Sequence, residues 1–222
     1  MTQPRLIADD LTGALDSAAA FVPAFGPQRV VWGDDPAGAA ALSSGTREAT
    51  AAEARRKLAA LASFLAPAPG RISVFKLDSL LRGHAGVELA AVIENVRFAH
   101  VVIAPAMPFQ GRITREGRQM ARSEAGWQIV GEDIAATLRA CGHAVANCRP
   151  GDPLPDGISI WDAETDSDLV AVVAGGRRAA GPVLWVGAAG LAAALAGAPS
   201  AAALVPARPL LGLIGTDHPV MR

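Results

Sequence analysis

Three short segments of the 222-residue sequence concentrate side chains that could do chemistry. The first contains Asp9 and Asp10, the second covers residues 76–83, and the third covers residues 105–112. Carboxylates accept hydrogen bonds from hydroxyl groups, and an arginine fork holds a carboxylate through two parallel hydrogen bonds. The combination predicts a site for a small ligand that carries both hydroxyls and an anionic group.

Each of these segments directly follows a short apolar run with the composition of a β-strand. The runs cover residues 5–8, 72–75 and 101–104. Several predicted strands are nearly continuous in apolar residues, as expected for strands covered on both faces. Because ligands bind beyond the carboxyl ends of the strands in an open parallel sheet, we expect the three segments to meet at one edge.

A structural role competes with the functional one at each segment. Asp is a common N-cap residue, so Asp9 and Asp10 could belong to a turn that caps a helix. Asp78 and Ser79 could cap a helix in the same way, and Arg82 could be a solvated side chain. The coincidence of three such segments at successive strand ends favours a ligand site.

The wider pattern alternates short apolar runs with amphipathic stretches, which is typical of βαβ units. We expect an α/β fold with an open, mainly parallel, twisted sheet and helices on both faces, as in Rossmann-like domains. The predicted strands are residues 5–8, 29–32, 72–75, 101–104, 158–161, 183–186 and 210–214. Helices are predicted after the first strand, over residues 50–65, 86–96, 132–141 and 189–196, and from Thr165 onward.

Residues 105–128 fit neither pattern, because they hold several glycines and arginines and few apolar side chains. We therefore expect a long loop there. A loop of that length inside a compact domain is usually functional or disordered.

Composition limits the classes of function. The formal net charge is -1 and the pI is about 6.4, which argues against a nucleic-acid partner or a polybasic membrane surface. The first residues show no apolar stretch after a basic region, and no run reaches the ~18 apolar residues of a membrane-spanning helix. We expect a soluble, cytoplasmic protein with no membrane partner.

The metal-binding and redox residues form no recognisable motif. Cys141 and Cys148 are too far apart for a CxxC motif, and the four histidines lack metal-ligand spacing. We expect free thiols and no metal site formed by these residues.

Nucleotide-binding loops give one ambiguous match. The sequence has no GxxxxGK[ST] loop. Gly187 and Gly190 follow a predicted strand and open a predicted helix, which resembles a degenerate dinucleotide fingerprint. Close packing of the strand against the helix explains the two glycines equally well.

Taken together, the polar segments resemble the signature blocks of the four-carbon acid sugar kinases. These are bacterial proteins long catalogued as a domain of unknown function and sometimes labelled type III effectors. The blocks are Ile7-Ala-Asp-Asp-Leu-Thr-Gly-Ala-x-Asp16, Lys76-x-Asp-Ser-x-Leu-Arg-Gly83 and Ala104-Pro-Ala-x-Pro-x-x-Gly-Arg112. Supporting similarities are Thr46-Arg47, Asp162-Ala-x-Thr165-x-x-Asp168 and Gly187-x-Ala-Gly-Leu-Ala192. The sequence departs from the family at Leu80, usually Thr, and at His84, often Asn.

The resemblance implies phosphoryl transfer from ATP, with Mg²⁺, to a terminal hydroxyl of a threonate, erythronate or 3-oxo-tetronate type acid. It implies that residues 1–208 form a sugar-binding domain and that residues 209–222 begin a C-terminal ATP-binding domain otherwise absent from this sequence. An ATP-binding domain would then act in cis or in trans, and we expect the isolated chain to be inactive without it. The resemblance leaves a homo-oligomer open.

The resemblance also suggests roles for individual residues. Asp10, Asp78 and Lys76 are the predicted catalytic residues: the two carboxylates hold hydroxyls, and one of them accepts a proton. Lys76 either neutralises phosphoryl charge or pairs with Asp78. The predicted substrate-binding residues are Asp9, Arg47, Ser79, Arg82, Gly83 and Arg112, with Arg82 and either Arg47 or Arg112 on the substrate carboxylate.

Two other classes of function stay open. One is a non-catalytic, orphan sugar-acid-binding domain. The other is an aspartate-based phosphohydrolase, because an acidic cluster follows the first strand and a lysine follows the strand at residues 72–75. That chemistry uses carboxylates two residues apart, whereas Asp9 and Asp10 are adjacent.

Overall fold

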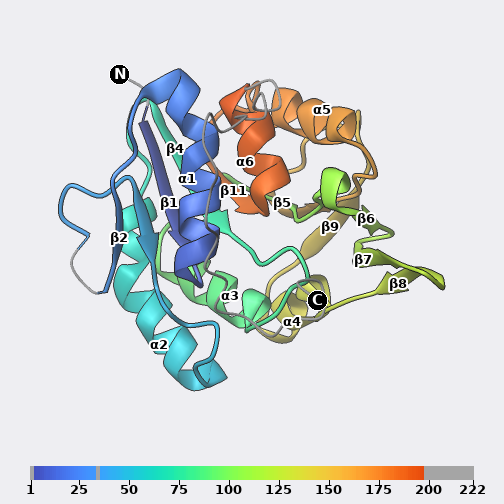
Figure 1. Cartoon of the computed structure of the whole chain (residues 1–222), viewed down its shortest axis with the longest axis horizontal. Coiled ribbons are helices and arrows are strands. Elements are labelled where there is room, and N and C mark those ends of the chain that lie inside the picture. Colours follow the sequence, from blue (N-terminus) through green and yellow to red (C-terminus); the bar gives the residue numbers. More distant parts are fainter. Residues whose placement is uncertain (1–2, 34–35, 198–222) are drawn as a thin grey trace, which may run out of the picture.

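An eight-stranded parallel sheet forms the centre of the computed structural model, which describes residues 3–33 and 36–197. Its strands are β1 (Gln3–Ala8), β2 (Val30–Trp32), β3 (Ala41–Ser43), β4 (Arg71–Lys76), β5 (His100–Ala104), β9 (Val145–Cys148), β10 (Gly157–Trp161) and β11 (Val183–Gly187). Their order is β2-β3-β1-β4-β11-β5-β10-β9, and every neighbouring pair is parallel (Figure 1). The predicted open, parallel α/β fold is confirmed.

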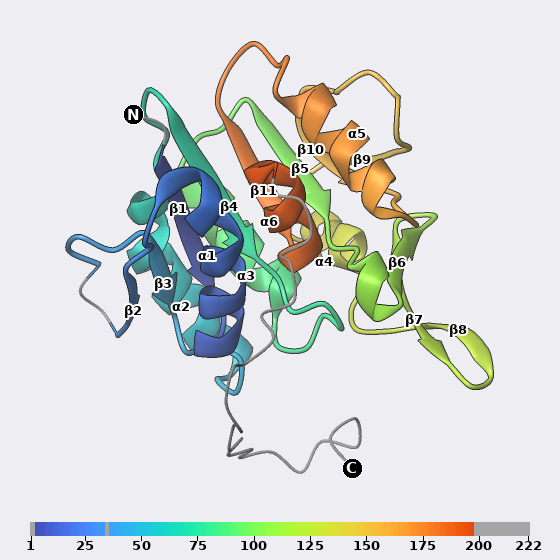
Figure 2. The ribbon, with the colours of Figure 1, turned by 45° about the horizontal axis from the view of Figure 1, so that its top comes forward.

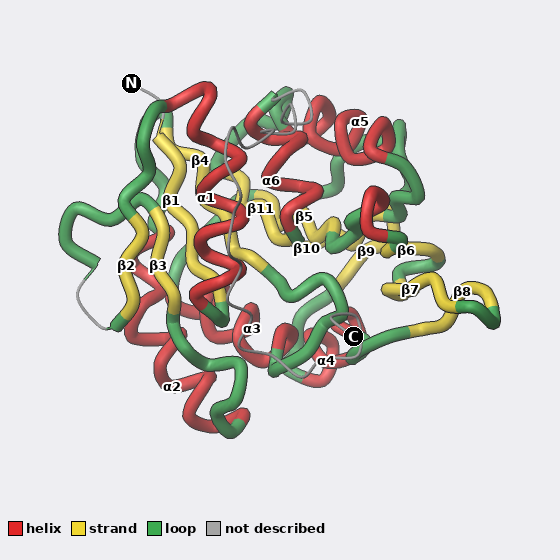
Figure 3. The backbone as a smooth tube through the Cα atoms, in the orientation of Figure 1, coloured by secondary structure: helices red, strands yellow, loops and turns green. Residues whose placement is uncertain are grey.

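Helices cover both faces of this sheet (Figure 3). The helices are α1 (Leu11–Phe25), α2 (Ala51–Leu61), α3 (Ala85–Asn95), α4 (Ile134–Ala140), α5 (Asp166–Gly176) and α6 (Ala189–Ala196), with short 3₁₀ turns at η1 (Ala62–Leu65) and η2 (Pro108–Gln110). Helices α1, α5 and α6 pack against one another on one face, and α2, α3 and α4 do so on the other. The capping patterns Thr50-x-x-Glu53 and Thr165-x-x-Asp168 both form capping boxes.

The core consists of two apolar layers separated by the sheet. In β1, Leu6 and Ala8 face the layer of α1, α5 and α6, whereas Ile7 faces the opposite layer. In β5, Val102 and Ile103 divide in the same way. Successive side chains of a strand point to opposite faces, so a strand covered on both sides is apolar throughout.

The order of the strands creates an opening beside β1. The chain leaves β1 through α1 on one face and adds β2 and β3 to one side of it. It then crosses through α2 on the other face and adds β4 to the other side. The connections after β1 and β4 therefore leave toward opposite faces of the sheet, and ligands of open α/β sheets bind at the carboxyl ends of strands arranged in this way.

Most predicted strands agree with the structure. The six that lie within the described residues match β1, β2, β4, β5, β10 and β11 to within two residues at each end. The strand predicted at residues 210–214 lies outside the described part of the chain. The short strands β3 and β9 were missed, because β3 has only three residues and β9 is an edge strand with two exposed residues.

The loop expected over residues 105–128 is the main correction. This region folds into a second, antiparallel sheet of β6 (Arg112–Arg115), β7 (Arg118–Ser123) and β8 (Gly126–Ile129). Glu116 and Gly117 join β6 to β7 with φ of 52° and 71°, as a two-residue hairpin turn requires. Figure 2 shows the β7–β8 hairpin projecting from the body of the domain. This three-stranded sheet, called the ribbon below, exposes all of β8 and the end of β7. It therefore needs few apolar residues, which gives a weak signal in the sequence.

Two adjacent glycines of α5 offer a test of the packing between helix and sheet. A side chain at Gly176 would overlap the buried ring of Trp185, whereas one at Gly175 would meet nothing within 4 Å. We expect Gly176→Ala to reduce the free energy of unfolding by about 1–3 kcal/mol through overpacking. Gly175→Ala should be neutral or stabilise by up to about 1 kcal/mol. Urea unfolding measures both, and equal effects would contradict the observed packing.

Candidate functional site

Asp9 leaves the end of β1 and is held by Arg47 from the segment after β3. The Arg47 Nε and Nη2 atoms donate to the two carboxylate oxygens of Asp9 at 2.6 and 2.7 Å. The backbone also joins the two segments, because the Thr46 amide donates to the Asp9 carbonyl at 2.9 Å. This two-pronged geometry is the strong form of an arginine–carboxylate pair.

Arg47 also joins the carboxylates of two other site residues. Its Nη1 atom lies 3.0 Å from Asp10 Oδ2 and 3.5 Å from Asp78 Oδ1. Burial alone would lower the pKa of Arg47, but hydrogen bonds and charges from the three carboxylates raise it well above its usual value. Arg47 is therefore a permanent cation at the centre of three carboxylates, and their oxygens already surround its guanidinium group.

Asp78 organises the loop that follows β4. Its Oδ2 atom accepts hydrogen bonds from the amides of Leu80 and Arg82, at 3.0 and 3.2 Å. Arg82 also donates from Nε and Nη2 to the Asp78 carboxylate, at 3.0 and 2.7 Å. Burial would raise the pKa of Asp78, but Arg82 and Arg47 outweigh burial and lower it to about 2. Asp78 is therefore ionised and saturated with donors.

The same loop contains an unusual backbone conformation. Leu81 is buried and has a φ of 54°, in the left-handed region that non-glycine residues seldom adopt. Gly83 has a φ of 83°, and a side chain there would sit 3.5 Å from Asp9 Oδ2. Such strain persists only where surrounding contacts impose it, and it is concentrated at functional sites.

Lys76 lies deep beneath these carboxylates rather than at the opening. Its side chain is buried, and its Nζ atom donates to the Leu77 carbonyl at 2.8 Å. A side chain at Gly13 would approach this Nζ atom to 3.1 Å. Burial lowers the pKa of Lys76, and four nearby aspartates oppose that effect. Direct pairing with Asp78, one of the two alternatives for Lys76, is not among the ion pairs of the described residues.

Asp10 is the most open of the three carboxylates. It is the N-cap of α1 and accepts a hydrogen bond from the Gly13 amide at 2.7 Å, so the capping role is real. Its side chain is nevertheless 27% exposed, and it lines a cavity of about 340 Å³ together with Asp9, Arg47 and Trp32. Trp32 is 74% exposed, and this residue was not expected at the site.

Arg82 and Arg112 provide positive charge that is not fully committed. The Arg82 side chain is 52% exposed despite its pairing with Asp78. Arg112 follows η2, and its Nη1 atom donates to Gln110. Burial lowers the pKa of Arg112, with an opposing influence from Asp78 and a further lowering from Arg82, so its charge is within electrostatic range of both. Ser79 lies half-buried in the same loop.

The glycines at 187 and 190 are explained by packing. A side chain at Gly187 would overlap the carbonyl oxygen of Ala104, and one at Gly190 would come within 2.7 Å of the Ala106 carbonyl. These contacts bring α6 and β11 against the segment after β5. The structural interpretation of this motif therefore accounts for both glycines without a nucleotide.

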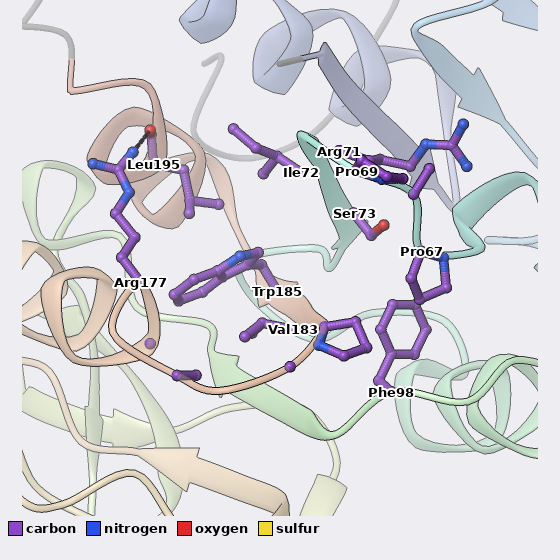
Figure 4. Close-up of a pocket in the computed structure, with 15 residues that line it drawn as sticks. Pro67, Pro69, Arg71, Ile72, Ser73, Phe98, Arg177, Val183, Trp185 and Leu195 are labelled. Atoms are coloured by element: carbon purple, nitrogen blue, oxygen red, sulfur yellow. Dashed lines mark hydrogen bonds between the residues drawn. The ribbon is translucent and has the colours of Figure 1, made fainter. Parts of the chain in front are cut away.

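A larger cavity lies far from these side chains. It has a volume of about 540 Å³ and is lined by the first residues of β4 and β11, at the opposite edge of the sheet. Figure 4 shows Trp185, Phe98 and several prolines around it, with Arg177 bonded to the Leu195 carbonyl. Its arginines Arg71 and Arg177 already donate to backbone carbonyls. It holds no acid–base cluster, so we place the site at the carboxyl edge.

Sequence comparison identifies the family of this domain. Residues 5–137 match the family described as the sugar-binding N-terminal domain, and the match covers more than half of the chain. The chain belongs to this family. The predicted resemblance to the sugar-binding domain of the four-carbon acid sugar kinases is thereby confirmed.

Relatives of this sugar-binding domain include a D-threonate kinase from Cupriavidus necator, 30% identical over 250 residues. The alignment covers 95% of the chain but 60% of that kinase, so the chain spans less than two thirds of its relative. A protein from Bordetella bronchiseptica, solved with bound citrate as a domain-swapped dimer, is 26% identical with a TM-score of 0.62, over 86% of this chain and 54% of that one. A Haemophilus influenzae protein shares the fold at 19% identity, with a TM-score of 0.61 over 86% of this chain and 55% of that one.

The structure brings the predicted residues of the sugar-binding domain together. Arg47 contacts all three predicted carboxylates, and Arg82 bonds to Asp78. Gly83 lies beside Asp9, and Arg112 is within electrostatic range of Asp78. The sequence reasoning missed Trp32, Glu88 and Gln119, and the Gln119 amide donates to the carbonyl of Ser79. An aromatic residue at the end of the second predicted strand was a usable signal for Trp32. Glu88 is buried in α3 beside Thr46 and Asp9, and no local pattern indicates that.

Other properties of the sugar-binding domain follow from the described residues alone. Both cysteines are free thiols, as predicted. None of the described helices is both long and apolar enough to span a bilayer. Within the same residues, no group of three or more His, Cys, Asp or Glu side chains could hold a metal ion.

The low pKa of Asp78 makes a prediction about stability at acid pH. The folded pKa of about 2 lies below the ordinary 3.8, so the ion pair stabilises the fold above pH ~4 and is lost as pH falls toward 2. Linkage gives a total of about 2 kcal/mol, of which about 1 kcal/mol is lost between pH 6 and pH 3. Urea unfolding of the native protein and Asp78→Asn should show their difference shrinking by that amount. A constant difference would contradict the pairing.

Proposed function

We propose that this domain binds a four-carbon sugar acid and presents its terminal hydroxyl for phosphorylation, as part of an ATP-dependent kinase. The family's sugar-binding description and the similarity to a D-threonate kinase support this proposal. Threonate, erythronate and 3-oxo-tetronate type acids all carry the carboxylate and hydroxyls that the site residues complement. The observation that carries the proposal is one partly exposed carboxylate, Asp10, in a cluster that also holds the half-exposed Arg82.

The proposal assigns the proton-accepting role to Asp10 rather than to Asp78. Asp9 and Asp78 are both buried, and each binds an arginine through both of its oxygens, so neither carboxylate is accessible to a substrate hydroxyl. Asp10 is partly exposed at the cavity and uses one oxygen to cap α1. Its other oxygen faces Arg47, which would stabilise the carboxylate as it binds the hydroxyl.

The substrate carboxylate is assigned to Arg82 and Arg112. Arg47 is saturated by three protein carboxylates, which suits an orienting role better than ligand binding. Arg82 is half-exposed, and its side-chain bonds to Asp78 use Nε and Nη2. Arg112 supplies a second charge nearby. Ser79 and Gly83 would border the ligand, and Lys76 would act as a buried positive charge beneath it.

The described residues offer no complete Mg²⁺ site of their own. Asp9 and Asp78 are committed to arginines, and among the described residues no group of three or more His, Cys, Asp or Glu side chains could hold a metal ion. We therefore assign ATP and Mg²⁺ to an ATP-binding domain, joined in cis or supplied in trans. The chain alone would bind the sugar acid without phosphorylating it.

Two statements about partners belong to the same proposal. The Bordetella protein binds citrate, which is a hydroxy acid, and forms a domain-swapped dimer. A homo-oligomer of this chain stays a prediction. A non-catalytic sugar-acid-binding domain would use the same site. The phosphohydrolase alternative is disfavoured, because Asp9 would have to break two bonds to Arg47 to act as a nucleophile.

Asp10→Asn separates ligand binding from helix capping. Asn caps a helix about as well as Asp, so we expect unfolding of the free protein to change little. Loss of the negative acceptor should abolish most of the thermal stabilisation by D-threonate. Differential scanning fluorimetry at a fixed ligand concentration measures both effects.

Asp133→Asn is the matched control for this experiment. Asp133 is the N-cap of α4 and accepts a hydrogen bond from the Ala136 amide at 2.9 Å, outside the cluster. This variant should keep the full ligand shift. If Asp10→Asn also keeps it, Asp10 has no role in binding.

Arg82→Lys tests the fork that binds the substrate carboxylate. A lysine keeps the charge but loses the planar geometry, so affinity for D-threonate should fall by about 1.5–3 kcal/mol, or about 10- to 100-fold in Kd. Calorimetry should also show no binding of threitol, which lacks the carboxylate. Arg115→Lys is the control, because Arg115 forms an equivalent pair with Glu164 outside the cluster. Equal affinities for all three proteins would return Arg82 to a structural role.

A further inference from the structure

Gln119 is a buried polar residue in a ribbon whose edge strand β8 is exposed. It lies in β7 and is 2% exposed. The neighbouring strand β8 is exposed along its whole length. A ribbon that only covered the surface would bury an apolar side chain at this position, because a buried amide must find partners for three hydrogen-bonding groups.

All three groups have partners, and the partners come from three different segments of the chain. The Gln119 Nε2 atom donates to the carbonyl of Ser79 at 2.9 Å and to that of Pro105 at 3.1 Å. Its Oε1 atom accepts from the Thr114 hydroxyl at 3.0 Å. Both carbonyls can only accept, so the orientation of the amide is fixed by its partners.

The contacts join the loops after three strands of the main sheet. Ser79 belongs to the loop after β4 that carries Asp78, and Pro105 directly follows β5. Thr114 exchanges two backbone hydrogen bonds with Ala163, in the segment after β10, at 2.9 and 3.0 Å. Gln119 is thus one of the residues that tie the ribbon to the carboxyl edge of the sheet.

A second contact holds the same loop from the same side. Gly131 follows β8, and a side chain there would overlap the Leu80 carbonyl and Leu81. Leu81 is the residue with the left-handed backbone. The end of the ribbon and the amide of Gln119 therefore enclose the strained part of the loop that carries Asp78 and Arg82.

We propose that Gln119 is a positioning residue, which fixes the loop of residues 76–83 so that Asp78, Ser79 and Arg82 are preorganised for the sugar acid. The inference rests on the proposed function. It assigns to the ribbon a role in shaping the site, and Gln119 itself does not contact the ligand. Loss of its two donated hydrogen bonds should free the loop and weaken binding.

Hydrogen exchange tests the positioning role without any ligand. The amides of Leu80, Leu81 and Arg82 all bond to Asp78. In Gln119→Glu, a carboxylate oxygen replaces the donor and faces two carbonyls, so these amides should exchange about tenfold faster than in the native protein. Gln128→Glu makes the same substitution at an exposed position of β8 and should leave them unchanged.

Calorimetry with D-threonate supplies the second measurement. We expect Gln119→Glu to raise the Kd about tenfold, while Gln128→Glu keeps the native value. Gln119→Met, which removes the donors without adding charge, should show the same trend in both measurements. If Gln119→Glu does not fold, the exchange rates and the Kd of Gln119→Met test the positioning role instead.

The outcomes separate the two proposals. If the native chain binds no sugar acid, the proposed function fails, whereas exchange in the loop still reports whether Gln119 holds it. Unchanged exchange in the Gln119 variants would overturn the inference, whatever the affinity. Faster exchange with native affinity would also overturn it, because the loop would then not need Gln119 to bind ligand.

Discussion

The site depends on one guanidinium group. Arg47 is the cation around which Asp9, Asp10 and Asp78 assemble, and these carboxylates come from segments after β1 and β4. Three carboxylates this close would repel one another strongly without it. Removing one partner of a buried ion pair costs several kcal/mol because the other charge is left uncompensated. The cluster is therefore rigid, and its two saturated carboxylates leave Asp10 as the chemically available one.

The fold supplies this cluster with its geometry. β1 has the parallel strands β3 and β4 on its two sides, so the segments that follow all three strands begin at the same edge of the sheet. The β3 segment is bonded to Asp9 through its backbone, which delivers Arg47 to the carboxylates. The larger cavity at the opposite edge has none of these charges. Concavity alone would have pointed to the opposite end of the sheet from this charged cluster.

The ribbon of β6, β7 and β8 shows how a peripheral element can shape such a site. Its edge strand β8 is exposed to solvent, while its central strand β7 places Gln119 against two loops of the main sheet. The Asp162 carboxylate accepts hydrogen bonds from the amides of Glu116 and Gly117, in the turn between β6 and β7, at 3.0 and 2.9 Å. The loop after β4 is thus supported by an element outside the main sheet.

The sequence by itself determined the parallel α/β fold and the capped starts of the helices, because both follow from local patterns of residues. It also predicted that Asp9, Asp10, Asp78 and Arg82 would lie together, because the carboxyl ends of parallel strands meet at one edge of the sheet, and the structure brings them together. Only the tertiary structure decided which carboxylate is open, since saturation of Asp9 and Asp78 depends on arginines from other segments. The ribbon and Gln119 were equally out of reach. An exposed hairpin needs few apolar residues, and a buried amide is recognised only by the distant carbonyls that it bonds.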